Sequence, residues 1–308
     1  MPRFFLLRQT FLGFLSRNRS IRSQLATTIR LMTQENHTFS QQTLAFIGGG
    51  NMASAILGGL LRQGMPAEQI WVIEPFEESR QRLTQLGVHT LAAPSAQLQQ
   101  ADLVIWAVKP QSFQEAAQQN LAHCAQALHL SVAAGIRSDS IAQWLGTQRV
   151  VRAMPNTPAL IGLGQTGLFA RAGVSESERR LIEQALQPTG QLVWVDKESL
   201  LDAVTALSGS GPAYVFYFIE AMIQAGVSMG LSTEQAHQLA VGTFVGASSL
   251  ASTSTEPPHV LRERVTSKGG TTYAALSAME QSHVAALFQQ AMQAARLRAE
   301  ELGDAFGK

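Results

Sequence analysis

Residues 43–53 read TLAFIGGGNMA, an apolar run that passes directly into three glycines. The run is typical of a buried strand, and residues 54–63 continue with the apolar periodicity of a helix. Between them lies G-x-G-x-x-A: Gly48 permits a tight turn, Gly50 lets a pyrophosphate approach, and the small Ala53 lets the helix pack on the strand. This context favours a dinucleotide-binding site over a glycine turn that merely joins two elements.

A second apolar run supports the same interpretation. Residues 70–73 read IWVI and end in Glu74, and an acid at that place normally accepts hydrogen bonds from an adenosine ribose. Further strands are predicted at 88–91, 102–108, 127–132, 149–153, 163–170 and 190–195, with helices at 77–86 and 175–186. This alternation predicts an α/β, Rossmann-like dinucleotide-binding domain over residues 43–195.

Three successive strands of this domain end in small or proline-fixed turns. The turns are Lys109-Pro110, residues 133–135 (AAG) and residues 154–158 (MPNTP). In open α/β sheets, ligands bind at the carboxyl ends of the strands. Each turn alone is equally well explained as an ordinary connection, but the three together favour a lined cleft.

The strand signal stops beyond Asp196, where the pattern becomes helical. Helices are predicted at 200–206, 212–229, 233–252 and from about 273 to the end, with a break at 208–212. The second of these is apolar all round at residues 214–219, which predicts burial on every side. A second subunit is the simplest way to bury it. Residues 196–308 are therefore predicted to form an all-α substrate and dimerisation domain.

Composition excludes several classes of protein. Of the 308 residues 45% are hydrophobic and 15% charged, as in a globular chain, and no apolar run is long enough for a membrane span. The single cysteine, Cys124, excludes an intrachain disulfide and a thiolate zinc cluster; no metal site is predicted, and a cytoplasmic location is expected. Without residues 1–31 the chain has a net charge of −5, which argues against a nucleic-acid partner.

Residues 1–42 are predicted to be an N-terminal extension, disordered or preceding a later true start. Residues 1–31 hold six arginines and no acid. Three explanations stay open: an upstream start codon with Met32 as the true first residue, an organelle-targeting segment, or a helix on a membrane surface.

A second chemical feature lies at residues 262–274, which read RERVTSKGGTTYA. Two glycines let the backbone approach a ligand closely, and Thr271 and Thr272 are placed at the start of a helix. A helix N-terminus binds anions through its free backbone N–H groups. The stretch is therefore predicted to hold a small carboxylate.

With these residues in view, the chain resembles the Δ1-pyrroline-5-carboxylate reductases, the last enzymes of proline biosynthesis. The resemblance covers residues 43 to about 303. Its motifs are FIGGGNMA at 46–53, AVKPQ at 107–111, SVAAG at 131–135, VRAMPNTPALIGLG at 151–164, DAVTALSGSGPAY at 202–214 and VTSKGGTTYAAL at 265–276. The SGSGPAY and GGTT blocks make it much more specific than the glycine pattern alone.

The resemblance implies that hydride from NADPH or NADH reduces the C=N bond of a cyclic imine carboxylate to give L-proline, in a homodimer or larger oligomer. It implies a catalytic Thr272 whose hydroxyl faces the ring nitrogen. The implied substrate contacts are Glu198, Thr205, Ser267, Gly270, Thr271 and Thr272. The implied cofactor contacts are Ile47, Gly48, Gly49, Gly50, Asn51, Met52, Glu74, Ala107, Val108, Lys109, Pro110, Ala133, Ala134, Gly135 and Asn156.

Three positions depart from the family pattern. Lys268 stands where proline is common, either beside the carboxylate or pointing to solvent, and Arg264 stands where some members carry asparagine. Glu74 stands where some NADPH-preferring members have serine. A carboxylate there would repel a 2′-phosphate, and Arg80 could offset it. This favours dual or NADH-tolerant use.

Two other functions remain as alternatives. A related imine reductase or β-hydroxyacid dehydrogenase would share the fold. A β-hydroxyacid dehydrogenase requires a catalytic lysine on the first long helix after the Rossmann-like domain, and residues 212–230 contain no lysine. A non-catalytic cofactor-binding regulator is disfavoured by the complete GGTT and SGSGPAY blocks.

Overall fold

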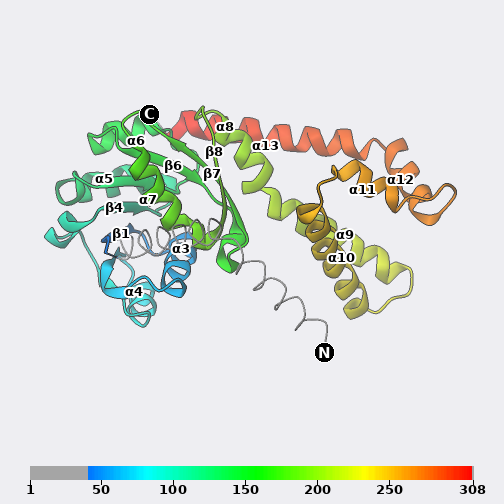
Figure 1. Cartoon of the computed structure of the whole chain (residues 1–308), viewed down its shortest axis with the longest axis horizontal. Coiled ribbons are helices and arrows are strands. Elements are labelled where there is room, and N and C mark those ends of the chain that lie inside the picture. The colour runs from blue at the N-terminus through cyan, green and yellow to red at the C-terminus, as the bar shows by residue number, and fades with distance from the viewer. Residues whose placement is uncertain (1–40, 307–308) are drawn as a thin grey trace, which may run out of the picture.

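The computed structural model describes residues 41–306. Figure 1 shows a sheet flanked by helices at one end of the molecule and a group of helices at the other, joined by the long C-terminal helix and by the helical segment that follows the last strand. The expectations for residues 1–31, including the start at Met32, lie outside the described residues.

The sheet has eight strands, and all eight were predicted from the sequence. Their order is β3-β2-β1-β4-β5-β6-β7-β8, parallel except that β7 runs antiparallel to β6. The strands are β1 (Leu44–Ile47), β2 (Ile70–Ile73), β3 (His89–Leu91), β4 (Leu103–Trp106), β5 (Leu128–Ser131), β6 (Val150–Met154), β7 (Gly164–Ala170) and β8 (Gly190–Trp194). The chain crosses from β3 back to β4 beside β1, so the carboxyl ends of β1, β2 and β4 open the crevice typical of a dinucleotide-binding fold.

The central strands are apolar on both sides because helices cover both faces of the sheet. Leu44 and Phe46 of β1 belong to one buried cluster, and Ala45 and Ile47 to another. Residues of α3 and α7 complete the first cluster, and residues of α5 and α6 complete the second. The helices of this part are α3 (Asn51–Arg62), α4 (Glu77–Thr84), α5 (Pro110–Cys124), α6 (Ser138–Leu145) and α7 (Glu176–Leu186). Short 3-10 turns lie at Ala67–Gln69, Ala96–Gln100, Thr157–Ile161 and Gln187–Thr189.

After β8, every element of the described chain is a helix. These elements are α8 (Leu200–Val204), a π-helical turn (Thr205–Gly209), α9 (Gly211–Ser228), α10 (Thr233–Thr253), α11 (Pro258–Arg264), α12 (Thr271–Gln281) and α13 (Val284–Phe306). The helix α9 begins with Pro212 in its first turn, as expected. None of the described helices is long and apolar enough to cross a membrane.

The break predicted at residues 208–212 is shorter in the structure, where it is confined to a bend at Ser210. A π turn leads into this bend, and the Ser210 N–H donates to the Thr205 carbonyl at 2.8 Å. Gly209 faces Met154 so closely that an added Cβ would lie 2.6 Å from the Met154 Cε atom. Gly209 therefore allows close packing against Met154 at the end of β6.

Two other helix predictions need correction. The single helix predicted from residue 273 to the end is two helices, because His283 adopts a left-handed conformation with φ of 52° between α12 and α13. The short helix α11 was not predicted. The C-terminal end of α13 turns back to the sheet, where Leu302 and Phe306 pack against Gly135.

The helix α9 is only partly covered within one chain, so its predicted burial on every side is not met there. It pairs with α10 along a close contact at Gly226, where an added Cβ would lie 3.0 Å from Ala236. Phe216 and Tyr217, however, are 59% and 69% exposed. Large apolar side chains left open in this way mark a surface that binds another protein.

Candidate active site

The glycine loop between β1 and α3 has the geometry that a pyrophosphate needs. Gly48 has a φ of 95°, and an added Cβ would lie 2.7 Å from the Ala107 carbonyl oxygen, so only glycine fits. Above Gly50, by contrast, no atom lies within 4 Å of an added Cβ. No side chain caps α3, so the N–H groups of its first turn are free to bind an anion. The loop therefore fits the phosphates of a dinucleotide.

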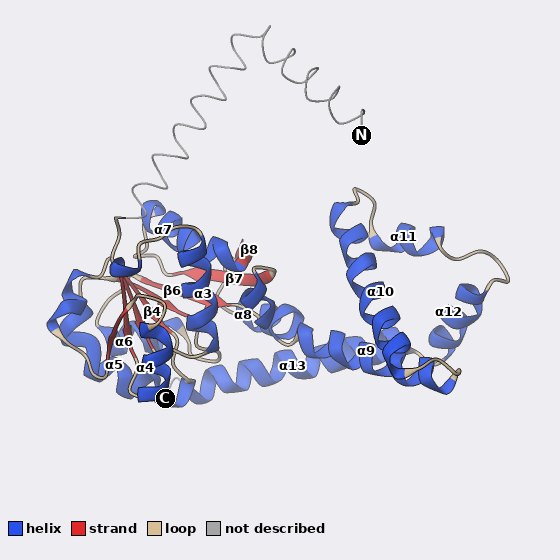
Figure 2. Cartoon of the chain, turned by 90° about the horizontal axis from the view of Figure 1, so that it is seen from below, coloured by secondary structure: helices blue, strands red, loops and turns tan. Residues whose placement is uncertain are grey.

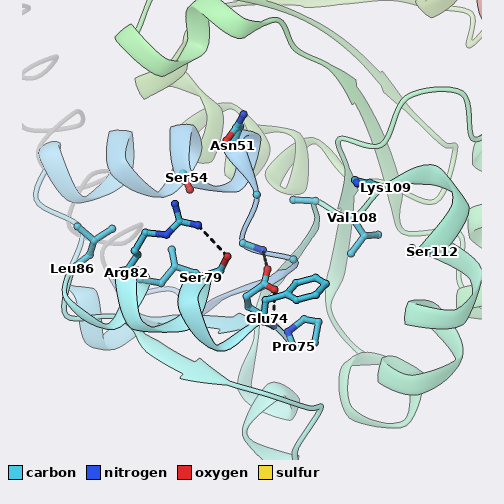
Figure 3. Close-up of a pocket in the computed structure, with 16 residues that line it drawn as sticks. Asn51, Ser54, Glu74, Pro75, Ser79, Arg82, Leu86, Val108, Lys109 and Ser112 are labelled. Atoms are coloured by element: carbon cyan, nitrogen blue, oxygen red, sulfur yellow. Dashed lines mark hydrogen bonds between the residues drawn. The ribbon is translucent and has the colours of Figure 1, made fainter.

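This loop borders a pocket of about 520 Å³ that opens between β1, β2 and β4 (Figure 3). Eight of the predicted cofactor contacts line it: Gly48, Gly49, Gly50, Asn51, Glu74, Ala107, Val108 and Lys109. Eight further lining residues were not predicted: Ser54, Pro75, Phe76, Ser79, Arg82, Leu83, Leu86 and Ser112. Four of these, Ser79, Arg82, Leu83 and Leu86, recur at helical spacing on and just after α4, a signal that was present in the sequence.

Glu74 is fixed in the wall of this pocket. The Gly49 N–H donates to its Oε2 atom at 2.8 Å, and the Phe76 N–H donates to its Oε1 atom at 3.0 Å (Figure 3). The residue is 6% exposed. Its carboxylate is thus held in one orientation, with lone pairs left for a ribose hydroxyl.

Arg80 does not line this pocket. Its Nη1 atom donates to the carbonyl oxygens of Glu74 and Pro75 at 2.8 and 2.6 Å, and its Nη2 atom pairs with Glu77. The arginine that does line the pocket is Arg82, whose Nη2 atom donates to the Ser79 hydroxyl at 3.1 Å.

Seven predicted cofactor contacts do not line the pocket: Ile47, Met52, Pro110, Ala133, Ala134, Gly135 and Asn156. Both polar atoms of the Asn156 amide are engaged inside the fold, because Nδ2 donates to the Ser208 carbonyl at 3.0 Å and Oδ1 accepts from the Gln165 N–H at 2.9 Å. Asn156 therefore ties the end of β6 to β7 and to the π turn. A contact of Asn156 with the nicotinamide stays a prediction.

Glu198 lies at the junction of the sheet and the helices. Its Oε1 atom accepts from Arg152 Nη1 and from the Ser138 N–H, both at 2.6 Å, and its Oε2 atom accepts from the Ser138 hydroxyl at 2.6 Å. Burial lowers the pKa of the Arg152 guanidinium, and the Glu198 charge opposes that shift. These contacts fix Glu198 in place at this junction, and its contact with substrate stays a prediction. Beside it, the Thr205 hydroxyl donates to the Leu201 carbonyl at 2.7 Å.

The predicted carboxylate site at residues 262–274, called the cradle below, includes the start of α12. Gly269 has a φ of 73°, the Gly270 N–H donates to the Ser267 carbonyl at 3.0 Å, and α12 begins at Thr271 without a side-chain cap. Its first N–H groups are therefore open to an anion. Lys268 is exposed and has no ion pair with any described acid, whereas Arg264 pairs with Glu256 at 2.6 Å. The start of α12 thus has the geometry predicted for it.

The cradle and the pocket lie far apart within one chain. In both Figures 1 and 2 the helices α11 and α12 stand at the end of α13 that is remote from the sheet. The opposite end of α13 packs on Gly135, and 23 residues of α-helix are about 34 Å long. One chain therefore does not bring its own cradle to its own pocket.

Comparison with known proteins agrees with these features. The pyrroline-5-carboxylate reductase of Pseudomonas aeruginosa is 42% identical over 273 residues, which cover 87% of this chain and 100% of the relative. The chain belongs to the pyrroline-5-carboxylate reductase family. The family model for pyrroline-5-carboxylate reductase dimerisation matches residues 198–302, and one described as NADP oxidoreductase coenzyme F420-dependent matches residues 43–135.

Solved structures of pyrroline-5-carboxylate reductases have the same fold. The enzyme from Coxiella burnetii is 36% identical and superposes with a TM-score of 0.80, covering 85% of this chain and 98% of that one. The Plasmodium falciparum enzyme, solved with NADP bound, is 26% identical with a TM-score of 0.76, covering 86% and 99%. The predicted arrangement of a Rossmann-like domain with a helical C-terminal part is thereby confirmed.

Proposed function

We propose that this chain reduces 1-pyrroline-5-carboxylate to L-proline with hydride from NADPH or NADH, the last step of proline biosynthesis. Membership of the pyrroline-5-carboxylate reductase family over 87% of the chain carries this proposal. The glycine-loop pocket and the uncapped start of α12 support it, because the reaction needs a dinucleotide site and a carboxylate site. A β-hydroxyacid dehydrogenase is disfavoured, since α9 contains no lysine.

The pocket beside the glycine loop would bind the dinucleotide cofactor. The free N–H groups at the start of α3 would hold the pyrophosphate, and Glu74 would accept a ribose hydroxyl. Phe76, Leu83 and Leu86 form an apolar wall suited to an adenine ring. When bound, the nicotinamide supplies the hydride.

The start of α12 would bind the imine substrate. The backbone around Gly270 and Thr271 would bind the carboxylate through the free N–H groups that open α12, with Ser267 beside them. The Thr272 hydroxyl would face the ring nitrogen. Holding the ring in one orientation accounts for much of the catalysis, since hydride transfer demands close alignment of two bound molecules. Thr272 would also hydrogen-bond the nitrogen as its charge changes.

A complete site needs two copies of the chain. We propose that the exposed apolar side chains of α9 and α10 bury themselves in a homodimer or larger oligomer. In that assembly the cradle of one protomer would lie over the pocket of its partner. The dimerisation family model over residues 198–302 supports this arrangement, as does the remoteness of α12 from the sheet in Figure 2.

Three further expectations stay proposals. The domain boundary would fall near Asp196, between the last strand and α8. A cytoplasmic location rests on the single cysteine, Cys124, which is buried and unpaired. The absence of a nucleic-acid partner rests on the acidic balance of the chain beyond residue 31.

The direct test is oxidation of NADH and of NADPH by the purified full-length protein, followed by absorbance, with 1-pyrroline-5-carboxylate as substrate. Turnover that produces L-proline is expected with at least one cofactor. A folded protein that binds cofactor but turns over only an acyclic imine or a β-hydroxyacid would refute the assignment.

A further inference from the structure

We infer that Arg82 and Ser79 form a subsite for the 2′-phosphate of NADPH, separate from Glu74, so that one pocket accepts both NADPH and NADH. This inference rests on the proposed function and concerns how the pocket distinguishes the two cofactors. Three charged side chains, Glu74, Arg80 and Arg82, follow the end of β2.

Glu74 presents a negative charge in the part of the pocket where an adenosine ribose would lie. Both its oxygens are held by backbone N–H groups, at 2.8 and 3.0 Å, so the carboxylate is fixed in place. A fixed carboxylate suits the free hydroxyls of NADH and repels the 2′-phosphate of NADPH, which carries about −1.5 to −2 charges. Binding of NADPH therefore requires a cation nearby.

Arg80, the cation expected from the sequence, is not available for this task. Its guanidinium donates to the carbonyl oxygens of Glu74 and Pro75 and pairs with Glu77. These contacts hold it against the first turn of α4. The contacts stabilise the connection after β2, and they direct the charge of Arg80 away from the pocket.

Arg82 meets the requirement. It lines the same pocket as Glu74, and its one described contact is the 3.1 Å hydrogen bond to the Ser79 hydroxyl. Among the residues that the structure describes, no acid forms an ion pair with Arg82. In Figure 3 its side chain extends from α4 over the pocket. Most of its five N–H donors are free for a phosphate, which a guanidinium binds through two parallel hydrogen bonds.

Helix periodicity explains why two arginines so close in sequence differ. Ser79 and Arg82 are three residues apart, and Leu83 and Leu86 continue the same face of the helix toward the pocket. Arg80 lies on another face. The apolar wall of Leu83 and Leu86 would place the adenine, and the ribose beside it would then lie within reach of both Glu74 and the Arg82–Ser79 pair.

The experiment compares cofactor binding by the intact protein in the absence of substrate, measured as the dissociation constants of NADH and NADPH in fluorescence titrations. The variants are Arg82→Gln, Arg80→Gln and, as a control for net charge, Arg180→Gln on the exposed side of α7. Circular dichroism would verify that each is folded. Turnover of 1-pyrroline-5-carboxylate with NADH by the unaltered chain, measured separately, tests the proposed function alone.

We expect Arg82→Gln to weaken NADPH binding by about 10-fold to 100-fold, the usual range for a lost hydrogen bond to a charged group. NADH binding should change by less than about twofold because no 2′-phosphate is present. Arg80→Gln and Arg180→Gln should leave the ratio of the two constants unchanged. An unchanged ratio in Arg82→Gln, or an equal loss for both cofactors, would overturn the inference, as would an unaltered chain that fails to bind NADPH.

Discussion

The Nη1 atom of Arg152 lies 2.6 Å from the Oε1 atom of Glu198, and the two side chains are 6% and 19% exposed. Arg152 belongs to β6 of the sheet, whereas Glu198 belongs to the segment that leads from β8 into α8. Their ion pair therefore fixes the point at which the helical part leaves the sheet. Because it is largely buried, loss of one partner leaves an uncompensated charge inside the protein.

Glu198→Gln should destabilise the protein by about 3 kcal/mol, because the Arg152 charge then stays buried without its counter-charge. Urea unfolding at a fixed protein concentration measures the loss. The double variant Arg152→Met/Glu198→Met should recover most of the stability, since a matched apolar pair removes both charges. If Glu198→Gln instead raised the KM for the imine without loss of stability, the originally predicted substrate contact would be correct.

Thr272→Ala should lower kcat by about 100-fold, because the hydroxyl that faces the ring nitrogen is lost from the reacting geometry. The dissociation constant of NADH should be nearly unchanged, since the hydroxyl is expected to face the imine nitrogen and not the dinucleotide. Thr272→Ser restores a hydroxyl and serves as the matched control. Equal turnover in the alanine variant and the unaltered chain would remove Thr272 from the mechanism.

Mixed dimers would show whether the cradle of one protomer serves the pocket of its partner. Gly50→Glu should block pyrophosphate binding without disturbing the fold, because no atom lies within 4 Å of an added Cβ. A dimer of one Gly50→Glu and one Thr272→Ala protomer, isolated with two different tags, would contain one intact composite site. It should show about half of the unaltered activity, as two equivalent sites in a symmetric dimer require. A mixed dimer as inactive as either parent would mean that each chain completes its own site.

His129 should make stability depend on pH. It is buried in β5, where its Nδ1 atom accepts from the Trp106 indole N–H at 3.1 Å. Burial and the nearby Arg149 charge lower the pKa of His129 from 6.5 to about 4, so the folded state favours the neutral ring. The contribution of the neutral His129 ring to the free energy of unfolding is fully present above pH 6.5 and is lost as the pH falls toward 4. The loss has an upper bound of about 3 kcal/mol.

The measurement is the free energy of unfolding in urea between about pH 7.5 and about pH 3.5, a range that spans the pKa of His129 in the unfolded state and its value of about 4 in the folded state. His129→Leu should reduce the slope in this range, although the lost indole partner lowers stability at every pH. His237→Gln, at an exposed position of α10, is the control and should keep the slope. An identical slope in the leucine variant would exclude His129 as its source.

The central strands β1, β4 and β5 were predictable because a strand covered on both faces is a short apolar run bounded by turn residues. Leu44 to Ile47 show why: alternate side chains enter two different clusters, and all four are apolar. The junction between α12 and α13 could not be predicted, because His283 takes a left-handed conformation with neither glycine nor proline to indicate it.

The parts of the site that depend on backbone geometry were predicted from the sequence. The parts that depend on contacts between distant side chains were predicted less well. The glycine loop and the start of α12 follow from residue types that permit only a few conformations. Nothing in the sequence states that Glu198 meets Arg152, 46 residues away. The choice between Arg80 and Arg82 depended on which face of α4 meets the pocket, and periodicity would have indicated it.

Arg137 joins α8 and α13 to the sheet domain. Its Nη1 atom bonds both carboxylate oxygens of Asp202 in α8, at 3.1 and 2.9 Å, and its Nη2 atom reaches the Glu300 carbonyl of α13 at 3.5 Å. The helical arm thus departs from the sheet and returns to it at the same side chain. A protease cut in the connection between α10 and α11 would leave a C-terminal fragment that still contacts Arg137 and Gly135 of the first fragment through α13, so the nicked protein should remain assembled.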